Sequence, residues 1–252
     1  MTQPRYLDAD VAEAAHQHAL RDFPNEAVGG VTAEGYLPLD NLSKTPTETF
    51  TCGGQIDALV ADGRLLALIH SHPFPNHSSA PSEIDIGQQI AMDVPWGIVP
   101  TDGQVCLPVY FWGDQIEPPP MIGRDFRYGP SGTDGKGDCA ALVRDWYRTQ
   151  WNIRLPEWPR AKGCWLNKPD LYRSNLTASG FMRINGGLTM VEPLPGDVLL
   201  MQIRSRTPNH VAIYLGGGRI LHHLEGRLSR EESLNRWSEF VTDWFRHDSV
   251  AS

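Results

Sequence analysis

The run Glu117-Pro118-Pro119-Pro120 places the strongest constraint on how this chain folds. Three consecutive prolines offer no backbone N–H, so they neither continue a strand ladder nor enter a helix interior. The charge balance changes at the same place: residues 1–118 hold 4 Lys/Arg and 16 Asp/Glu, whereas the remainder holds 18 and 14. Because 252 residues suffice for two ordinary cores, the sequence predicts two domains, residues 1–117 and 122–252.

Composition excludes several classes of protein. The weakly basic second half suits an anionic polymer such as a cell wall, but it has no arginine-rich helix, so nucleic acid is not predicted as the main partner. The scattered cysteines lack CxxC spacing and predict a reduced protein. We see no signal-peptide pattern and no apolar run near the ~20 residues of a membrane span, which predicts synthesis ending in a cytoplasm.

Hydrophobic periodicity predicts an α/β fold for the first domain. An Asp-capped helix ends at the turn Phe23-Pro24-Asn25, and a second helix starts after Pro81. A buried apolar strand delivers a histidine-rich segment at its end. The predicted helices are 10–21, 55–61 and one that begins after residue 81, and the predicted strands are 30–39, 48–52, 64–70, 96–99 and 105–111.

The histidine-rich segment has the donor types of a zinc site. His70 and His72 lie one residue apart, so on an extended segment they point the same way, and Asp85 at a helix start can complete a three-ligand site. Zinc would lower the pKa of a water to ~7, and Glu26 is the candidate base for its proton. An isolated HxH is more often an ordinary histidine pair, but the adjoining Pro73 and the Ser82-x-x-Asp85 pattern favour a metal site.

These motifs resemble the JAMM metalloproteases, which combine an upstream glutamate, HxHP and SxxD on a three-layer α/β fold. The resemblance covers roughly residues 5–112 and implies that His70, His72 and Asp85 bind Zn²⁺. It further implies that Glu26 is the general acid/base and that Ser82 helps to hold the water or the oxyanion. Nine residues separate His72 from Ser82, a longer loop than the common family pattern. In that loop His77 could compete as a ligand, and we interpret it as a solvated residue.

The second half predicts an α+β domain. A glycine-rich stretch leads to Asp138, whose side chain can cap a helix that starts at Cys139. Later, Pro195-Gly196-Asp197 opens an apolar strand, and two further strands form a hairpin across Gly216-Gly217-Gly218. The three predicted strands are 198–203, 210–214 and 219–223.

Cys139 is the candidate nucleophile of a second, different hydrolase. In the first turn of a helix, exposed N–H groups and the helix dipole favour the thiolate, so we predict a lowered thiol pKa. His210 begins the hairpin and would accept the proton of Cys139. His222 and His223 point to opposite faces of the next strand, so only one of them can orient His210.

This segment resembles the NlpC-type cysteine peptidases, which have a papain-like α+β fold. The resemblance rests on Asp138 to Leu142, Pro195-Gly196-Asp197 and His210 to Gly216. The family places its third polar residue twelve positions after the base, which selects His222 over His223. Ala140 stands where the family has a small hydroxyl residue, and Tyr128 is near but not in register with an upstream oxyanion tyrosine.

The two domains in this order resemble tail-tip assembly proteins of lambda-like phages. The resemblance implies hydrolysis of peptidoglycan stem peptides, typically at a D-glutamyl to diamino-acid bond, to aid cell-wall penetration. It also implies a zinc-dependent (iso)peptidase that processes a tail protein during assembly. The expected partners are peptidoglycan peptides and other tail-tip proteins, and the expected locations are the host cytoplasm during assembly and the tail tip of the virion.

Two alternatives remain open at this point. The protein can be a largely structural tail-tip component whose catalytic sites are idle or cryptic. The cysteine site can also be an acyltransferase or amidase, because the same nucleophile and base serve several acyl acceptors.

Overall fold

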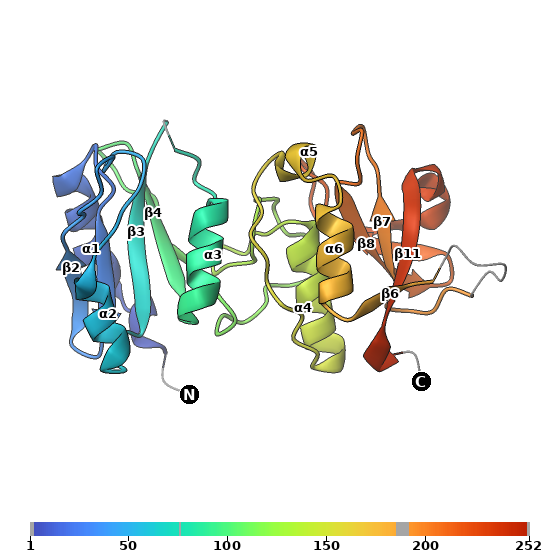
Figure 1. The fold of residues 1–252 in the computed structure, drawn as a ribbon, viewed down its shortest axis with the longest axis horizontal. Helices are drawn as coiled ribbons and strands as arrows, with labels where there is room; N and C mark the ends of the chain where they lie inside the picture. The colour runs from blue at the N-terminus through green and yellow to red at the C-terminus, as the bar shows by residue number, and fades with distance from the viewer. Residues whose placement is uncertain (1–2, 76, 185–191, 251–252) are drawn as a thin grey trace. The chain divides into compact units, whose positions relative to one another are not determined.

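The computed structural model describes residues 3–75, 77–184 and 192–250. The chain forms two compact units, each with its own sheet (Figure 1). The first comprises Met1–Pro81, Gly87–Glu117 and Gly132–Asp134, and the second comprises Ser82–Ile86, Pro118–Ser131 and Gly135–Ser252.

The first unit is built on a five-stranded mixed sheet of order β2-β1-β3-β4-β5. Only β3 and β4 run parallel, and the other neighbours pair antiparallel. A 3-10 turn, Arg5–Leu7, precedes the first helix. The elements are α1 Ala9–Asp22, β1 Val28–Thr32, β2 Gly35–Leu39, α2 Gly54–Ala61, β3 Ala67–Pro73, α3 Glu83–Met92, β4 Trp96–Thr101 and β5 Tyr110–Trp112. The first residues of α3, up to Ile86, are grouped with the second unit.

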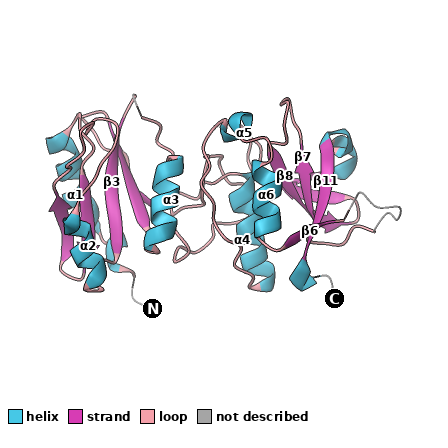
Figure 2. Ribbon diagram, in the orientation of Figure 1, coloured by secondary structure: helices cyan, strands magenta, loops and turns pink. Residues whose placement is uncertain are grey.

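Helices cover both faces of this sheet, as the alternation of side chains along β3 requires. Val11 and Ala15 of α1 pack with Ile69 of β3 on one face. Leu59 of α2 packs with Leu68 of β3 on the opposite face. The first unit is therefore a three-layer α/β arrangement of helix, sheet and helix (Figure 2).

Four predicted strands of this unit differ in the structure. The predicted strand 105–111 is shorter, because β5 spans only Tyr110–Trp112. The predicted strand 30–39 is a hairpin, because the chain turns back at Ala33 and Glu34 and enters β2 at Gly35, whose φ is +130°. The predicted strand 48–52 is absent, since Thr45 accepts backbone hydrogen bonds from residues 48 and 49 in a turn. Strand β3 runs through Pro73, so the two histidines lie within the strand and not after it.

The second unit places two main helices before a six-stranded antiparallel sheet of order β10-β9-β8-β7-β11-β6. Short 3-10 turns follow β10 and β11. The elements are α4 Cys139–Trp151, α5 Cys164–Asn167, α6 Leu171–Ala178, β6 Phe181–Arg183, β7 Val198–Met201, β8 His210–Gly216, β9 Arg219–His222, β10 Arg230–Ser233 and β11 Val241–His247, with turns at Leu234–Arg236, Ser238–Phe240 and Asp248–Val250.

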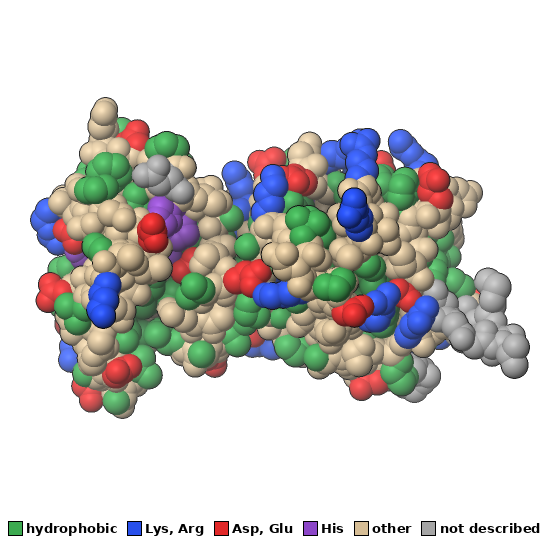
Figure 3. Space-filling view, turned by 45° about the horizontal axis from the view of Figure 1, so that its top comes forward, with side chains coloured by type: hydrophobic (Ala, Val, Ile, Leu, Met, Phe, Trp, Pro, Cys, Tyr) green, Lys and Arg blue, Asp and Glu red, His purple; other side chains and the backbone are tan. Residues whose placement is uncertain are grey.

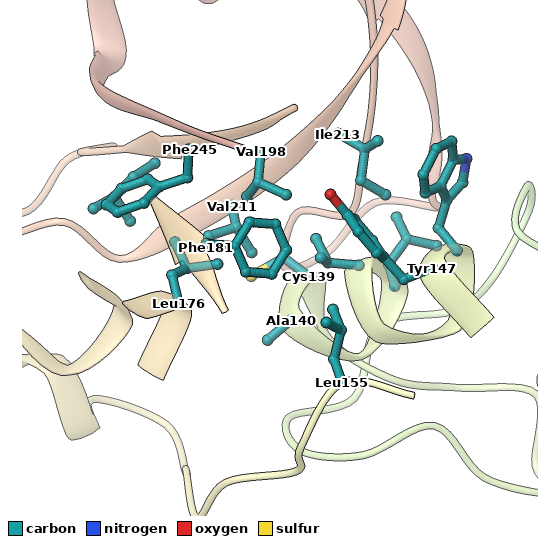
Figure 4. Packing of buried hydrophobic residues seen from close by; sticks show 14 of the residues in the cluster. Cys139, Ala140, Tyr147, Leu155, Leu176, Phe181, Val198, Val211, Ile213 and Phe245 are labelled. Carbon is teal, nitrogen blue, oxygen red and sulfur yellow. The ribbon is translucent and has the colours of Figure 1, made fainter. Parts of the chain in front are cut away.

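Helix α4 supplies the core of this unit. It begins where Asp138 accepts the N–H of Ala141 at 2.9 Å and ends at Asn152, whose φ of 55° is left-handed. Its apolar side packs on the sheet face that carries Val198 and Val211 (Figure 4). A helix followed by an antiparallel sheet gives the second unit an α+β fold.

The charge difference between the halves is visible on the surface. On the face drawn in Figure 3, most Lys and Arg side chains lie over the second unit, on the right of the picture. Among the described residues, no helix combines the length and the hydropathy needed to cross a bilayer.

Candidate active sites

Strand β3 delivers the two candidate histidine ligands to one face of the first sheet. His70 and His72 alternate with Ser71, so they share the face on which Leu68 packs against α2. Asp85 lies in the first turn of α3. Each of the three residues is buried, and their potential ligand atoms all lie within 4.8 Å of one another.

The donor set fits zinc. The Nδ1 of His72 donates to the carbonyl of Ser78 at 2.7 Å, which leaves its Nε2 lone pair available for a metal. The Nε2 atoms of His70 and His72 are 3.0 Å apart. A tetrahedral zinc with Zn–N bonds of about 2.0–2.1 Å separates two ligand nitrogens by about 3.3 Å, close to this spacing. The sequence-predicted ligands thus converge.

Ser82 and Asp85 hold each other at the start of α3. The Asp85 carboxylate accepts the backbone N–H of Ser82 at 2.7 Å, and the Ser82 hydroxyl accepts the backbone N–H of Asp85 at 3.1 Å. This reciprocal pair is a capping box, which satisfies two helix N–H groups and orients the carboxylate. Ser82 is exposed, and its hydroxyl takes part in this cap.

Glu26 is buried beside the loop that connects the two halves of the motif. Only 4% of Glu26 is exposed, and its Oε1 lies 3.5 Å from Nδ1 of His77. The other ring nitrogen of His77 donates to the carbonyl of Thr47 at 2.7 Å, and the His77 side chain is 19% exposed. The interpretation of His77 as a solvated residue is therefore wrong, because the longer loop folds its histidine onto Glu26 and toward the ring of His72.

The second candidate site lies in a pocket of about 490 Å³ in the second unit. Cys139 and His210 both line it. Cys139 is the first residue of α4, and its sulfur lies among apolar side chains that include Val211 (Figure 4). The hydroxyl of Tyr172 is 3.9 Å from the sulfur.

The surroundings of Cys139 favour the neutral thiol. Burial raises the pKa of Cys139 to about 12, and the carboxylate of Asp138 acts in the same direction. Hydrogen bonds from the Val211 backbone and the Tyr172 hydroxyl act against this shift without overcoming it. The predicted lowering of the thiol pKa is therefore wrong, because burial outweighs the helix N-terminus. The nucleophile must be generated by a base.

The base and its orienting residue meet on the hairpin of β8 and β9. In the register of these strands Ala212 opposes His222, which places His222 on the same sheet face as His210. The Nε2 of His210 lies 3.2 Å from Nδ1 of His222. Burial lowers the pKa of His210, and the two following histidines add to the effect. Gly217 and Gly218, with φ of +59° and +72°, form the two-residue turn that fixes this register.

His223 faces a different environment. It lies beyond the end of β9, its ring packs edge-on against Phe126 at 5.1 Å, and it lines the pocket. Burial lowers the pKa of His223 to about 4. The structure therefore brings His222 and not His223 into contact with His210.

Three residues near this site carry no sequence signal. Tyr172 lies on α6, in a segment with no motif, and reaches the sulfur of Cys139. Glu232 accepts a hydrogen bond from His222 at 3.0 Å, although its run Arg-Glu-Glu has the pattern of a solvated strand. Trp237 donates to Glu232 at 2.6 Å.

A buried arginine compensates the carboxylate that caps α4. The Nε and Nη2 of Arg160 bind both oxygens of Asp138 at 2.7 and 3.0 Å, and its Nη1 binds Glu157. Arg160 is fully buried and lies over the ring of Trp158. This bidentate pair fixes Asp138, which in turn fixes the position of the Cys139 backbone.

Tyr128 is engaged at the rim of the pocket. Its hydroxyl donates to Glu225 at 2.8 Å, and its ring stacks on Trp165. The carboxylate of Glu225 also pairs with Lys162. The hydroxyl of Tyr128 is thus held by Glu225, whereas Tyr172 is the tyrosine whose hydroxyl contacts the cysteine.

Comparison with known proteins identifies the second unit. Residues 123–246 match the NlpC/P60 family model, which confirms the prediction of an NlpC-type domain. The NlpC/P60 domain of the peptidoglycan hydrolase SagA is 18% identical, with a TM-score of 0.33, over 50% of this chain and 89% of that chain. NlpC2 from Trichomonas vaginalis is 20% identical, with a TM-score of 0.35, over 50% of this chain and 42% of that one.

Two curated relatives match most of the chain. Tail tip assembly protein K of Escherichia phage N15 is 32% identical over 246 residues, which cover 94% of each chain. Tail tip assembly protein K of Escherichia phage lambda is 34% identical over 192 residues, 73% of this chain and 83% of the relative. The similarity thus extends over both units.

Proposed function

Because the chain belongs to the tail tip assembly protein K family, we propose that it is a phage tail-tip component whose second unit hydrolyses peptide stems of peptidoglycan. One observation carries the proposal. Cys139 and His210 line a single pocket within the NlpC/P60 segment, and His222 contacts His210. This is the arrangement of a nucleophile, a base and a residue that orients the base.

The proposed reaction begins from a neutral thiol and a neutral imidazole. As the sulfur of Cys139 attacks the scissile carbonyl carbon, its proton passes to His210. His210 then returns this proton to the leaving amine, which departs and leaves a thioester. Water attacks the thioester while His210 accepts its proton, and transfer of that proton to the sulfur restores the thiol and releases the acid.

The rim of the pocket supports an anionic peptide as substrate. Arg204, Arg227 and Arg236 line the pocket and are exposed. Guanidinium groups bind carboxylates with two parallel hydrogen bonds. A D-glutamyl to diamino-acid peptide carries such carboxylates close to its scissile bond, so we assign this bond class to the site.

For the first unit we propose a zinc-dependent (iso)peptidase that processes a tail protein. His70, His72 and Asp85 would hold the zinc, which when bound would supply a water of pKa near ~7. Glu26 would take up and return the proton, and Ser82 holds Asp85 in position through the capping box and would help to hold the water or the oxyanion. The buried convergence of two imidazoles and one carboxylate supports this assignment.

The proposed locations follow from the same family. The protein would assemble in the host cytoplasm with other tail-tip proteins and would reach the cell wall at the tail tip of the virion. The burial of Cys139 also favours a second candidate, a tip component whose cysteine site is cryptic until the tip opens.

Digestion of purified host peptidoglycan tests the proposal. The wild type, Cys139→Ala and the double variant His70→Ala/His72→Ala are compared, and released fragments are identified by mass spectrometry. We expect fragments from the wild type and the double variant and none from Cys139→Ala. If none of the three proteins releases fragments although all are folded, the wall-hydrolase function is rejected. That result would support the cryptic or structural role.

A further inference from the structure

We propose that Glu232 is a positioning residue that extends Cys139, His210 and His222 into a chain of four. The inference rests on the proposed cysteine-peptidase function of the second unit. It concerns a residue that touches no substrate and acts through His222. The inference rests on a continuous series of hydrogen bonds that runs from the base His210 through His222 to the carboxylate of Glu232.

The fold aims Glu232 at His222. Strand β10 pairs antiparallel with β9, with Arg230 opposite His222 and Glu232 opposite Ile220. The Glu232 side chain is only 8% exposed. Its Oε2 accepts from Nε2 of His222 at 3.0 Å and from Nε1 of Trp237 at 2.6 Å. Two donors on one oxygen fix the carboxylate and, through it, the imidazole.

The carboxylate determines which nitrogen of each histidine carries a proton. An ionised carboxylate only accepts hydrogen bonds, so Nε2 of His222 must be the protonated nitrogen. Nδ1 of the neutral His222 is then an acceptor, and at 3.2 Å it accepts the Nε2–H of His210. Nδ1 of His210 is consequently the unprotonated nitrogen, which is the one that can accept the proton of Cys139.

The charges around Glu232 keep it ionised. Its Oε1 lies 3.1 Å from Arg230 and 3.5 Å from Arg236, while Oε2 serves His222 and Trp237. Burial acts to raise the pKa of Glu232, but the hydrogen bonds from His222 and Trp237 and the charge of Arg230 leave that pKa below its usual range. The carboxylate therefore stays an acceptor at neutral pH.

The negative charge also has a catalytic consequence. His210 is buried and its pKa is lowered, so protonation during the reaction is costly without a compensating anion. His222 connects the imidazolium of His210 to the carboxylate, as an aspartate supports the imidazolium in serine proteases. Removal of the charge should therefore slow proton transfer from Cys139 and leave substrate binding almost unchanged.

The chain offers a matched control on the same strand. Glu231 neighbours Glu232 on β10, and its carboxylate pairs with Arg219 at 2.7 Å on the exposed side of the strand. Glu231→Gln removes the same charge from the same strand without touching the histidines. We compare Glu232→Gln, which keeps the shape, Glu232→Ala, which removes the acceptor, and Glu231→Gln.

The first readout is the rate of Cys139 alkylation by iodoacetamide as a function of pH, which requires no peptidoglycan. The second is the KM and kcat for stem-peptide hydrolysis. We expect Glu232→Gln to lower kcat about 10- to 100-fold with KM within about twofold, and Glu232→Ala to lower it more. Both variants should slow alkylation near neutral pH, and Glu231→Gln should match the wild type. Wild-type alkylation and kcat in Glu232→Ala would overturn the proposal.

A third readout uses the wild type alone. The proposal can therefore still be refuted if a variant fails to fold. Nitrogen-15 chemical shifts report which ring nitrogen of His222 is protonated. We expect Nε2–H, and Nδ1–H would overturn the proposal. If the wild type cleaves no peptidoglycan but the tautomer and the alkylation effects are found, the wall-hydrolase function fails while the positioning role of Glu232 stands.

Discussion

At the scale of single residues, two influences oppose each other at the sulfur of Cys139. The helix N-terminus favours the thiolate, whereas burial favours the thiol and raises the pKa of Cys139 to about 12. The alkylation rate of Cys139 in the folded protein should therefore keep rising above pH 9 without a plateau. Measurement of the rate from pH 6 to 11, with the unfolded chain as reference, checks this. A plateau below pH 8 would contradict it.

The same shift has a defined effect on stability. Because the folded pKa of Cys139 is raised above the ordinary value of 9.0, its contribution to stability is fully present below pH 9. That contribution is lost as the pH rises from 9 toward 12. We expect Cys139→Ala to lose less stability than the wild type over this interval, as measured by urea unfolding at each pH.

Arg160 is a second residue whose buried environment affects the stability of the protein. Its guanidinium is buried and neutralises Asp138 and Glu157. Arg160→Met should lower the free energy of unfolding by about 3–5 kcal/mol, because buried Asp138 loses its counter-charge and Glu157 keeps only its pair with Arg144. Arg219→Met is the control, since the Arg219 side chain is 59% exposed and its pair with Glu231 should contribute less than about 1 kcal/mol. Equal losses in urea unfolding would refute the argument.

The sequence predicts those site residues that lie in motifs. The spacing of His70, His72 and Asp85 foretold their convergence, and hairpin alternation foretold that only one of His222 and His223 meets His210. Burial is a property of the whole fold, so the pKa direction of Cys139 could not be read from its position in a helix. The role of Glu232 was not predicted, because a run of charged residues on a strand is typical of a solvent-exposed sheet edge.

At the scale of elements, substitution of two glycines distinguishes the cost of backbone strain from the cost of a steric clash. Gly196 and Gly217 both have positive φ, +94° and +59°. A Cβ at Gly217 would meet nothing within 4 Å, whereas a Cβ at Gly196 would overlap the ring of Trp151. Gly217→Ala should therefore cost only about 1–2 kcal/mol of conformational strain. Gly196→Ala should cost clearly more, because the turn before β7 must also move. Urea unfolding of both variants compares the costs, and equal losses would contradict the packing argument.

Local signals explain which elements could be predicted. Asp138 and Ser82 mark the starts of α4 and α3, and Gly217 with Gly218 marks the hairpin. Strands β10 and β11 were not predicted, because the burial of their side chains depends on strands that are distant in sequence. For example, β11 pairs with β7. The hairpin between β1 and β2 was missed because its turn, Ala33-Glu34, lacks the Asn-Gly or Asp-Gly pair that typically marks a two-residue turn.

At the scale of the whole molecule, the proline run and the charge shift indicated two units, and the structure has two sheets with separate apolar cores. Two short segments are grouped with the other half of the chain: Ser82–Ile86 belongs to the second unit and Gly132–Asp134 to the first. The sequence did not predict this, because the grouping depends on contacts between residues that are distant in sequence. The resemblance to tail-tip assembly proteins is confirmed by relatives that are 32% and 34% identical.

The cysteine pocket and the candidate zinc cluster share no residue, so metal addition tests whether zinc acts at the candidate cluster alone. Two buried imidazoles and one carboxylate converge here, with 3.0 Å between the Nε2 atoms of His70 and His72. Zinc that binds the folded state only should stabilise it by about 4 kcal/mol at a free concentration near 1,000 times its Kd. A chelator should reverse this gain, and His70→Ala/His72→Ala should abolish it. Calorimetry measures the gain, while alkylation of Cys139 should proceed at the same rate with zinc or chelator. A gain that persists in the double variant would place the metal elsewhere.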